Sequence, residues 1–271
     1  MAEKTYDYDQ QYFEWLSESS RRSAERILPC LVDMCHVRSI LDVGCGVGAW
    51  LSAARAHGLD DVLGVDGPWV IPAQLEIPES CFQPVTLGAD FDLGRRFDLA
   101  ICLEVIEHLP AESAAPLIDV LIRHAPIVLF SAAVPDQGGD GHVNETWASH
   151  WRAHFAARGY ACFDPVRRKF WSDQAIDVWY RQNTRLFVCE QRMAANPELF
   201  DRLSSYPPLL DDLVHPELFE QRAREVRELR QRNDELARWG AQLQQRIARY
   251  QAFPPIALAR WIRQLARKVS G

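Results

Sequence analysis

The chain has 271 residues, of which 48% are hydrophobic and 25% charged, and its formal net charge is −7. These values are typical of a globular protein, and the negative charge excludes a protein built as a whole to attract nucleic acid. The length accommodates one large domain with an appendage, or two small domains. The seven cysteines are scattered and form no C-x-x-C pair, which indicates free thiols rather than a disulfide framework or a zinc site.

The N-terminal segment MAEKTYDYDQ is polar and acidic, and no apolar run has membrane-spanning length. We therefore expect a cytoplasmic protein without a signal peptide. Residues 1–37 are expected to form an N-terminal helical cover or lid. Its helix spans about 11–34 and is broken or kinked at Pro29. This segment carries the aromatic residues Tyr6, Tyr8, Tyr12 and Trp15.

Strands and helices alternate from residue 38 onward. Short apolar runs predict strands within 39–43, 61–67, 81–92, 97–105, 126–134, 160–164 and 184–190. Helical patterns occupy 49–58, 111–124 and 144–159. This alternation predicts an α/β fold, with a mostly parallel, doubly wound sheet and helices on both faces. In such a sheet, ligands bind at the carboxyl ends of the strands.

The composition changes toward the C-terminus. We expect a linker over 196–214 and a coiled-coil helix over 215–250, which would make the protein a homodimer. The two core positions of the heptads hold Phe219, Val226, Asn233, Gly240 and Ile247, and Leu229, Leu236, Leu243 and Tyr250. The polar Asn233 would set the register. Arg222 and Gly240 weaken the seam, so a single long helix packed on its own domain stays open.

Residues 255–269 predict a basic amphipathic helix. Its apolar positions are Trp261, Ile262, Leu265 and Val269, and its basic ones are Arg260, Arg263, Arg267 and Lys268. Two interpretations stay open. The helix makes weak contact with a membrane surface, which would place the protein at the periphery of the inner membrane. Alternatively, it is a solvated or partner-bound helix end.

The stretch SILDVGCGVGAW, residues 39–50, predicts a strand followed by a glycine loop. It fits both the G-x-G-x-x-G/A fingerprint of dinucleotide sites and a G-x-G-x-G loop that cradles S-adenosylmethionine. Asp42 discriminates between them. A carboxylate here would repel a pyrophosphate but attract the ammonium and sulfonium of S-adenosylmethionine.

Two further acids follow the next strands. Asp66 ends the second strand, 20 residues after Gly46, where a carboxylate accepts hydrogen bonds from the ribose hydroxyls of either cofactor. Asp90 follows the third strand in GADFDL, where it can accept from an adenine amine with Phe91 beside the ring. A dinucleotide site does not need this third acid.

The segments LDVGCGVGAW, VLGVDG, GADFDL and RFDLAICLEVIEHLP occur in the order and near the spacing of class I S-adenosylmethionine-dependent methyltransferases. Over about residues 38–190 the chain resembles that family. LFSAAVPDQGGDGHVNE and WYRQN further resemble a bacterial subgroup often associated with polysaccharide or secondary-metabolite pathways. The resemblance implies a methyltransferase domain over 38–195. It also implies a Rossmann-like, seven-stranded sheet whose last strand is antiparallel.

The resemblance also implies the cofactor S-adenosyl-L-methionine and its product S-adenosyl-L-homocysteine. Asp42 would lie near the ammonium group of this cofactor, and Asp66 would bind its ribose. Asp90 and Phe91 would contact its adenine. Cys45 is expected to be small filler rather than a nucleophile. The implied cofactor-binding residues are Asp42, Gly44, Cys45, Gly46, Asp66, Gly67, Asp90, Phe91, Leu103 and Glu104.

Methyl transfer to an alcohol benefits from a general base. His142 lies in the glycine-rich loop after the fifth expected strand, and Glu145 is three residues further on and could orient it. His108 is a second candidate base. Asp136 and Asp140 add oxygen ligands to this loop, but nothing in the spacing demands a metal, and we expect none.

The acceptor is expected to be a hydroxyl of a sugar or a glycosylated small molecule, by analogy with the subgroup. Trp179, Tyr180, Arg181 and Asn183 are the candidate substrate-binding residues. Three alternatives stay open. They are N-methylation of a small-molecule amine, an NAD-dependent oxidoreductase, and a scaffold that keeps the cofactor site. Asp42 and the lack of a catalytic Tyr-Lys pair disfavour the oxidoreductase.

Overall fold

The structure, a computed structural model, describes residues 10–207, 210–252 and 254–269. The chain divides into two compact units, of which the first ends at Leu218 and the second begins at Phe219. None of the helices in these described segments is long and apolar enough to cross a membrane.

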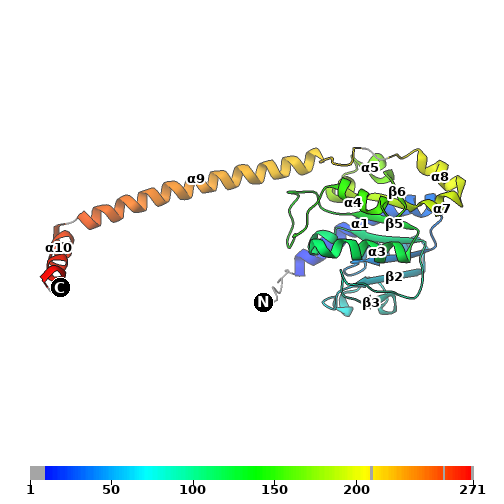
Figure 1. The fold of residues 1–271 in the computed structure, drawn as a ribbon, viewed down its shortest axis with the longest axis horizontal. Coiled ribbons are helices and arrows are strands. Elements are labelled where there is room, and N and C mark those ends of the chain that lie inside the picture. Colours follow the sequence, from blue (N-terminus) through cyan, green and yellow to red (C-terminus); the bar gives the residue numbers. More distant parts are fainter. Residues whose placement is uncertain (1–9, 208–209, 253, 270–271) are drawn as a thin grey trace. The chain divides into compact units, whose positions relative to one another are not determined.

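The first unit is built on one seven-stranded sheet in the order β3-β2-β1-β4-β5-β7-β6. Neighbouring strands are parallel from β3 to β5, whereas β7 lies antiparallel between β5 and β6. This arrangement confirms the predicted Rossmann-like sheet with its last strand antiparallel (Figure 1). The strands are β1 (Ser39–Val43), β2 (Asp61–Asp66), β3 (Phe82–Pro84), β4 (Leu99–Leu103), β5 (Ile127–Ser131), β6 (Tyr160–Phe163) and β7 (Arg185–Cys189).

Helices cover both faces of the sheet because alternate strand residues point in opposite directions. Ile40 and Ile101 pack in a core with α1 and α2, whereas Leu41 and Cys102 pack in a second core with α3 and α4 (Figure 1). The helices of this unit are α1 (Gln10–Cys35), α2 (Ala49–Ala56), α3 (Ala114–His124), α4 (Ala148–Ala156), α5 (Pro165–Phe170), α6 (Val178–Asn183), α7 (Glu190–Ala194) and α8 (Pro197–Ser204).

Two of the expected helices, α1 and α4, have other bounds than the sequence predicted, and α5, α6 and α7 were not predicted. Helix α1 continues through Pro29 to Cys35. Helix α4 begins only at Ala148, because the preceding residues are tied to the sheet edge. The backbone N–H groups of Asn144 and Thr146 donate to the carbonyls of Glu107 and Ala133. The expected lid aromatics Tyr6 and Tyr8, and the side chains of Tyr12 and Trp15, lie outside the described residues.

The segment 196–214, expected as a linker, is instead packed against the first unit. It contains α8, whose Leu199 and Leu203 are buried in the core beside α1. Asn196 caps this helix, since its side chain accepts from the N–H of Leu199. The prediction missed α8 because proline and polar residues flank its two core leucines.

The second unit consists of the long helix α9 (Pro216–Ala252), whose first turn lies in the first unit, and of α10 (Pro254–Val269). Several expected heptad core residues of α9 are exposed, namely Phe219, Val226, Leu229, Leu236, Ile247 and Tyr250. A row of exposed large apolar side chains marks a helix face that needs a partner.

We expect this face to pair with a second copy of the chain in a parallel coiled coil. Replacing Leu236 by Asp puts a charge into the seam and should convert the dimer to a monomer in light scattering of the full chain. Gln231→Asp adds the same charge on the opposite side of the helix and should leave the mass unchanged. A monomeric starting protein, or equal effects of the two changes, would contradict the prediction.

Candidate active site

The turn after β1 can be made only with glycine at position 44. Gly44 has φ +81°, and a Cβ built there would come within 2.4 Å of a methyl carbon of Val105. Gly46 also has positive φ, but open space surrounds the position of its missing Cβ. The backbone of the turn is therefore bare on the side of Gly46, where a ligand can approach it closely.

Asp66 ties this turn to the end of β2. Its carboxylate accepts hydrogen bonds from the N–H of Gly46 at 2.7 Å and from the N–H of Gly67 at 2.6 Å. Burial raises the pKa of Asp66, and the two backbone donors oppose that shift. The structure thus brings together Asp66, Gly46 and Gly67, three of the residues that the sequence predicted.

Asp42 is buried close to Asp66 and also faces the ends of these strands. Burial, and secondarily the charge of Asp66, raises the pKa of Asp42 to about 8. The same burial raises the pKa of the Cys45 thiol, so this residue stays protonated at neutral pH. An inert thiol agrees with the expected filler role of Cys45, and the two acids make the site suited to a cation.

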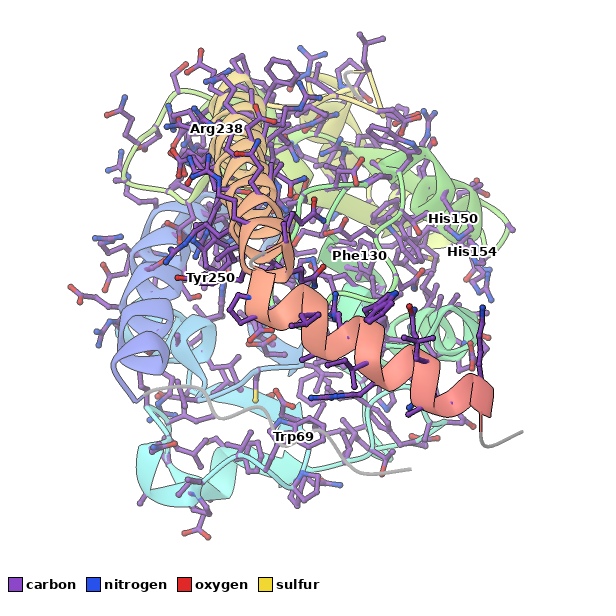
Figure 2. All side chains as sticks on the ribbon, turned by 90° about the vertical axis from the view of Figure 1, so that its left-hand side faces the viewer. Trp69, Phe130, His150, His154, Arg238 and Tyr250 are labelled. Carbon is purple, nitrogen blue, oxygen red and sulfur yellow. The ribbon has the colours of Figure 1, made fainter. Side chains whose placement is uncertain are left out.

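Trp69 is a residue that the sequence reasoning missed. Its indole ring lies over Gly67, so that a Cβ on Gly67 would meet the ring at 2.1 Å. The side chain is nevertheless 67% exposed (Figure 2). A tryptophan three residues after the acid that ends β2 is a signal that could have identified this exposed aromatic surface beside Asp66.

Asp90 and Phe91, the residues expected at the adenine, are held by contacts with α3. Arg123 of α3 bridges them, since one guanidinium nitrogen lies 2.7 Å from the Asp90 carboxylate and 2.7 Å from the Phe91 carbonyl. The ring of Phe91 lies 5.9 Å from that of His124. Asp90 is exposed, so its ion pair with Arg123 is weak and leaves its carboxylate accessible.

The end of β4 carries a strained residue next to Leu103. Glu104 has φ +53°, a conformation that non-glycine residues rarely adopt outside special sites. Its carboxylate accepts from the Asn183 side-chain amide at 3.1 Å and from that of Gln137 at 2.9 Å. A predicted cofactor residue and a predicted substrate residue, Glu104 and Asn183, therefore share one polar network.

Glu107 was not singled out from the sequence. An acidic residue inside the apolar run LAICLEVIEHL is unusual and could have drawn attention to it. It is fully buried, and its carbonyl accepts from the N–H groups of Val143 and Asn144. Its side chain accepts from the N–H of Ala133 at 3.2 Å. Burial and the nearby Glu104 raise the pKa of Glu107 well above its usual range. Glu107 thus fixes both ends of the loop that carries His142.

The three predicted catalytic residues lie together. The Nδ1 atom of His142 is 2.8 Å from the Glu145 carboxylate, and the same oxygen accepts from the N–H of Gly138. The His108 ring stands edge-on to that of His142, with centroids 4.8 Å apart. Partial burial, and then the neighbouring His142, lowers the pKa of His108.

Of the four predicted substrate-binding residues, Tyr180, Arg181 and Asn183 are buried and Trp179 is partly buried. Tyr180 packs edge-on against Trp50 with ring centroids 5.2 Å apart, and its hydroxyl lies 3.0 Å from that of Ser20. Burial raises its pKa to about 12. Trp179 packs partly buried against the same core. Both aromatics therefore contribute to the packing of α6 against the core.

The Arg181 side chain is engaged by partners within the fold. It donates to the carbonyls of Ile176 and Trp171 and pairs with Glu217 at 2.6 Å. The sequence could not show this, because Glu217 lies 36 residues away along the chain. Of the predicted substrate-binding group, Asn183 is the member that reaches the site.

The first turn of α9 packs against the start of the loop that carries His142. Leu218 packs with Val134 and Val178, and Val134 begins the loop. The N–H of His215 donates to Gln182, whose amide lies 3.4 Å from the Gln137 side chain. A contiguous set of contacts therefore joins α9 to the network around Glu104.

No group of three or more His, Cys, Asp or Glu side chains within the described residues is arranged to hold a metal ion. Asp136 has φ +61° in the turn before the glycines, and Asp140 lies near His108. His142 and Glu145 form a hydrogen-bonded pair, which fits proton transfer to or from His142.

Residues 8–183 match the family described as methyltransferase domain, and the chain belongs to this family. It is a class I methyltransferase whose cofactor is S-adenosylmethionine, and this assignment overturns the oxidoreductase alternative. The residues present fit that cofactor. The turn is bare at Gly46, and the buried Asp42 and Asp66 suit a cationic ligand.

Solved structures with the same fold include DesVI from Streptomyces venezuelae. It is 15% identical with a TM-score of 0.51, covering 68% of this chain and 100% of that one. The sugar N-methyltransferase KedS8 from Streptoalloteichus sp ATCC 53650 is 18% identical, with a TM-score of 0.51. The match covers 70% of this chain and 98% of KedS8. A search of curated protein sequences finds no match.

The support from α9 can be tested with two leucine-to-alanine changes. Leu218 is 6% exposed, so Leu218→Ala should lower the free energy of unfolding by about 2 kcal/mol. Leu210 is 76% exposed, and Leu210→Ala should change it by less than about 0.5 kcal/mol. Urea unfolding of the full chain measures both. Equal effects would show that Leu218 does not support the first unit.

Proposed function

We propose that this enzyme methylates a hydroxyl group of a sugar or a glycosylated small molecule, with His142 as the general base. The observation that carries the proposal is the His142–Glu145 pair at 2.8 Å, placed beyond the carboxyl ends of β4 and β5. An alcohol has a high pKa and must lose its proton as it attacks, which such a pair assists. Glu145 would orient the ring and stabilise its protonated form.

The cofactor, when bound, supplies an activated methyl group and a neutral thioether leaving group. In this proposal Gly44, Cys45 and Gly46 offer their backbone to its methionyl part, and Asp42 faces the ammonium. The Asp66 carboxylate holds the ribose beside Gly67, and Asp90 with Phe91 meets the adenine. The backbone at Leu103 and Glu104 closes the pocket at the end of β4.

The glycine-rich loop would control access to His142. Only 12% of the His142 side chain is exposed, and Nε2 lies against Gly139, where a Cβ would come within 2.3 Å. Nε2 is the nitrogen that remains for the acceptor, because Nδ1 is engaged by Glu145. The loop must therefore shift to admit the acceptor. Gly138 and Gly141, both at positive φ, supply the backbone freedom for this shift.

N-methylation of an amine is the second candidate, since KedS8 is described as a sugar N-methyltransferase. A neutral amine attacks without first losing a proton, so it depends much less on a base. The partly buried network of Glu104, Gln137 and Asn183 is compatible with either acceptor. The role of His142 therefore separates the two functions.

Cofactor binding should release a proton from Asp42. With a pKa of about 8, this carboxyl group is largely protonated at pH 7 in the free protein. An ammonium placed beside it favours the ionised form, so binding S-adenosylhomocysteine should release close to one proton at pH 7. Calorimetry in two buffers of different ionisation enthalpy measures this number.

Asp42→Asn is the matched control and should bind without this buffer dependence. Raising the pH to 9 should also abolish it in the unaltered protein, because Asp42 is then already ionised. If the unaltered protein and Asp42→Asn release the same number of protons at pH 7, Asp42 does not face the ammonium.

Replacing His142 by Gln should lower kcat for an alcohol acceptor by about 10²–10⁴-fold and leave the affinity for S-adenosylhomocysteine unchanged. His150→Gln alters an exposed histidine of α4 and should leave both quantities as they are. Steady-state kinetics and calorimetry provide the measurements. A loss below threefold in His142→Gln would exclude a general base at this position and favour the amine acceptor.

A further inference from the structure

The terminal helix α10 has one continuous apolar face. Leu258, Trp261, Ile262 and Leu265 follow one another at spacings of three, one and three residues, which places them on one side of a helix. Each of these side chains is between 40% and 59% exposed. A single helix that leaves four large apolar side chains in water needs something apolar to cover them.

The charge of α10 is strongly one-sided. Arg260, Arg263, Arg267 and Lys268 give residues 254–269 four positive charges, and no Asp or Glu lies in this range. The whole chain carries −7, so this helix departs sharply from the rest of the sequence. Arg260, Arg263 and Arg267 lie opposite the apolar face at helical spacing, while Lys268 lies at its border.

We propose that α10 binds flat on the surface of an anionic phospholipid bilayer, with its apolar face buried at the level of the headgroups and upper acyl chains. This occupant satisfies both observations at once. The bilayer covers Leu258, Ile262 and Leu265, and its phosphates meet the arginines. Trp261 lies at the edge of the apolar face, which suits the boundary between headgroup and hydrocarbon.

A second copy of α10 fits the same face less well. Pairing the apolar faces of two copies would bring two sets of four positive charges together, with no acid on this helix to offset them. α9 differs in this respect, because it carries both Glu and Arg along its length, including the Arg222–Glu225 pair. The two helices of the second unit therefore require different partners.

The dimensions agree with surface binding. Sixteen residues of helix span about 24 Å, and an apolar face with an opposing basic face inserts only to the depth of the interface. Basic residues near an anionic surface each contribute about fivefold to the affinity at moderate salt. This inference concerns the second unit and does not depend on which acceptor is methylated.

The test is sedimentation of the full-length protein with vesicles. Vesicles of phosphatidylcholine with 30% phosphatidylglycerol should bind the protein in 0.1 M salt, and pure phosphatidylcholine vesicles should bind it at least tenfold more weakly. Binding to the anionic vesicles should fall again in 0.5 M salt, because salt screens the arginines.

Two substitutions with the same charge change locate the contact. Ile262→Glu puts a carboxylate into the apolar face and should weaken binding to the anionic vesicles more than 30-fold. Gln264→Glu puts it on the polar side and should weaken binding by about fivefold. Thermal unfolding of the first unit should be the same for both variants, so a loss of binding cannot be ascribed to misfolding.

Three results would overturn the proposal. They are no binding to anionic vesicles, equal binding to neutral ones, and equal losses for Ile262→Glu and Gln264→Glu. Binding to a short DNA duplex without binding to vesicles would assign the basic face to a polyanion in solution instead.

Discussion

The cofactor side of this enzyme depends on one buried carboxylate. Asp66 accepts from the N–H groups of Gly46 and Gly67 and so joins the loops that follow β1 and β2. Without that carboxylate, two backbone donors at a bare turn would attract an anion such as a phosphate. With Asp66 engaging these donors, the turn no longer attracts an anion. Burial and the charge of Asp66 keep Asp42 protonated in the free protein, and a cationic ligand favours its ionised form.

A second pair of acids, Glu104 and Glu107, lies near the proposed base His142 and organises the loop and side chains around it. Glu107 fixes the loop of His142 through its carbonyl and its carboxyl group, whereas Glu104 organises amide side chains from that loop and from α6. Burial, and then the neighbouring Glu104, raises the pKa of Glu107 well above its usual range. The network ends at α9, and the loop therefore shares its support with the C-terminal region.

The sequence was a good guide wherever a residue acts within its own segment. The strands, the glycine turn and the His142–Glu145 pair are all encoded within a few positions, whereas Asp66 and the antiparallel β7 follow a pattern that spans several segments of the family. The sequence was a poor guide where a role depends on distant contacts. Arg181 was taken for a substrate ligand because its partner Glu217 is far along the chain. Tyr180 is indistinguishable from an exposed aromatic until α1 and α2 are packed against it. Helix α8 has only two core leucines, and the polar residues around them are typical of a linker, so the sequence did not predict this helix.

The division at Leu218 explains how one chain can carry two kinds of surface. The buried acids and the contacts that hold the His142 loop lie in the first unit, and these contacts end with the first turn of α9. Beyond that turn α9 and α10 leave their large apolar side chains exposed, so they contribute little to the folding of the first unit. Exposed leucine, isoleucine and tryptophan in regular rows are costly in water and promote association. Their arrangement is therefore best understood as a requirement for partners. The mixed charges and Asn233 of α9 suit another helix, and the uniformly basic α10 suits an anionic surface.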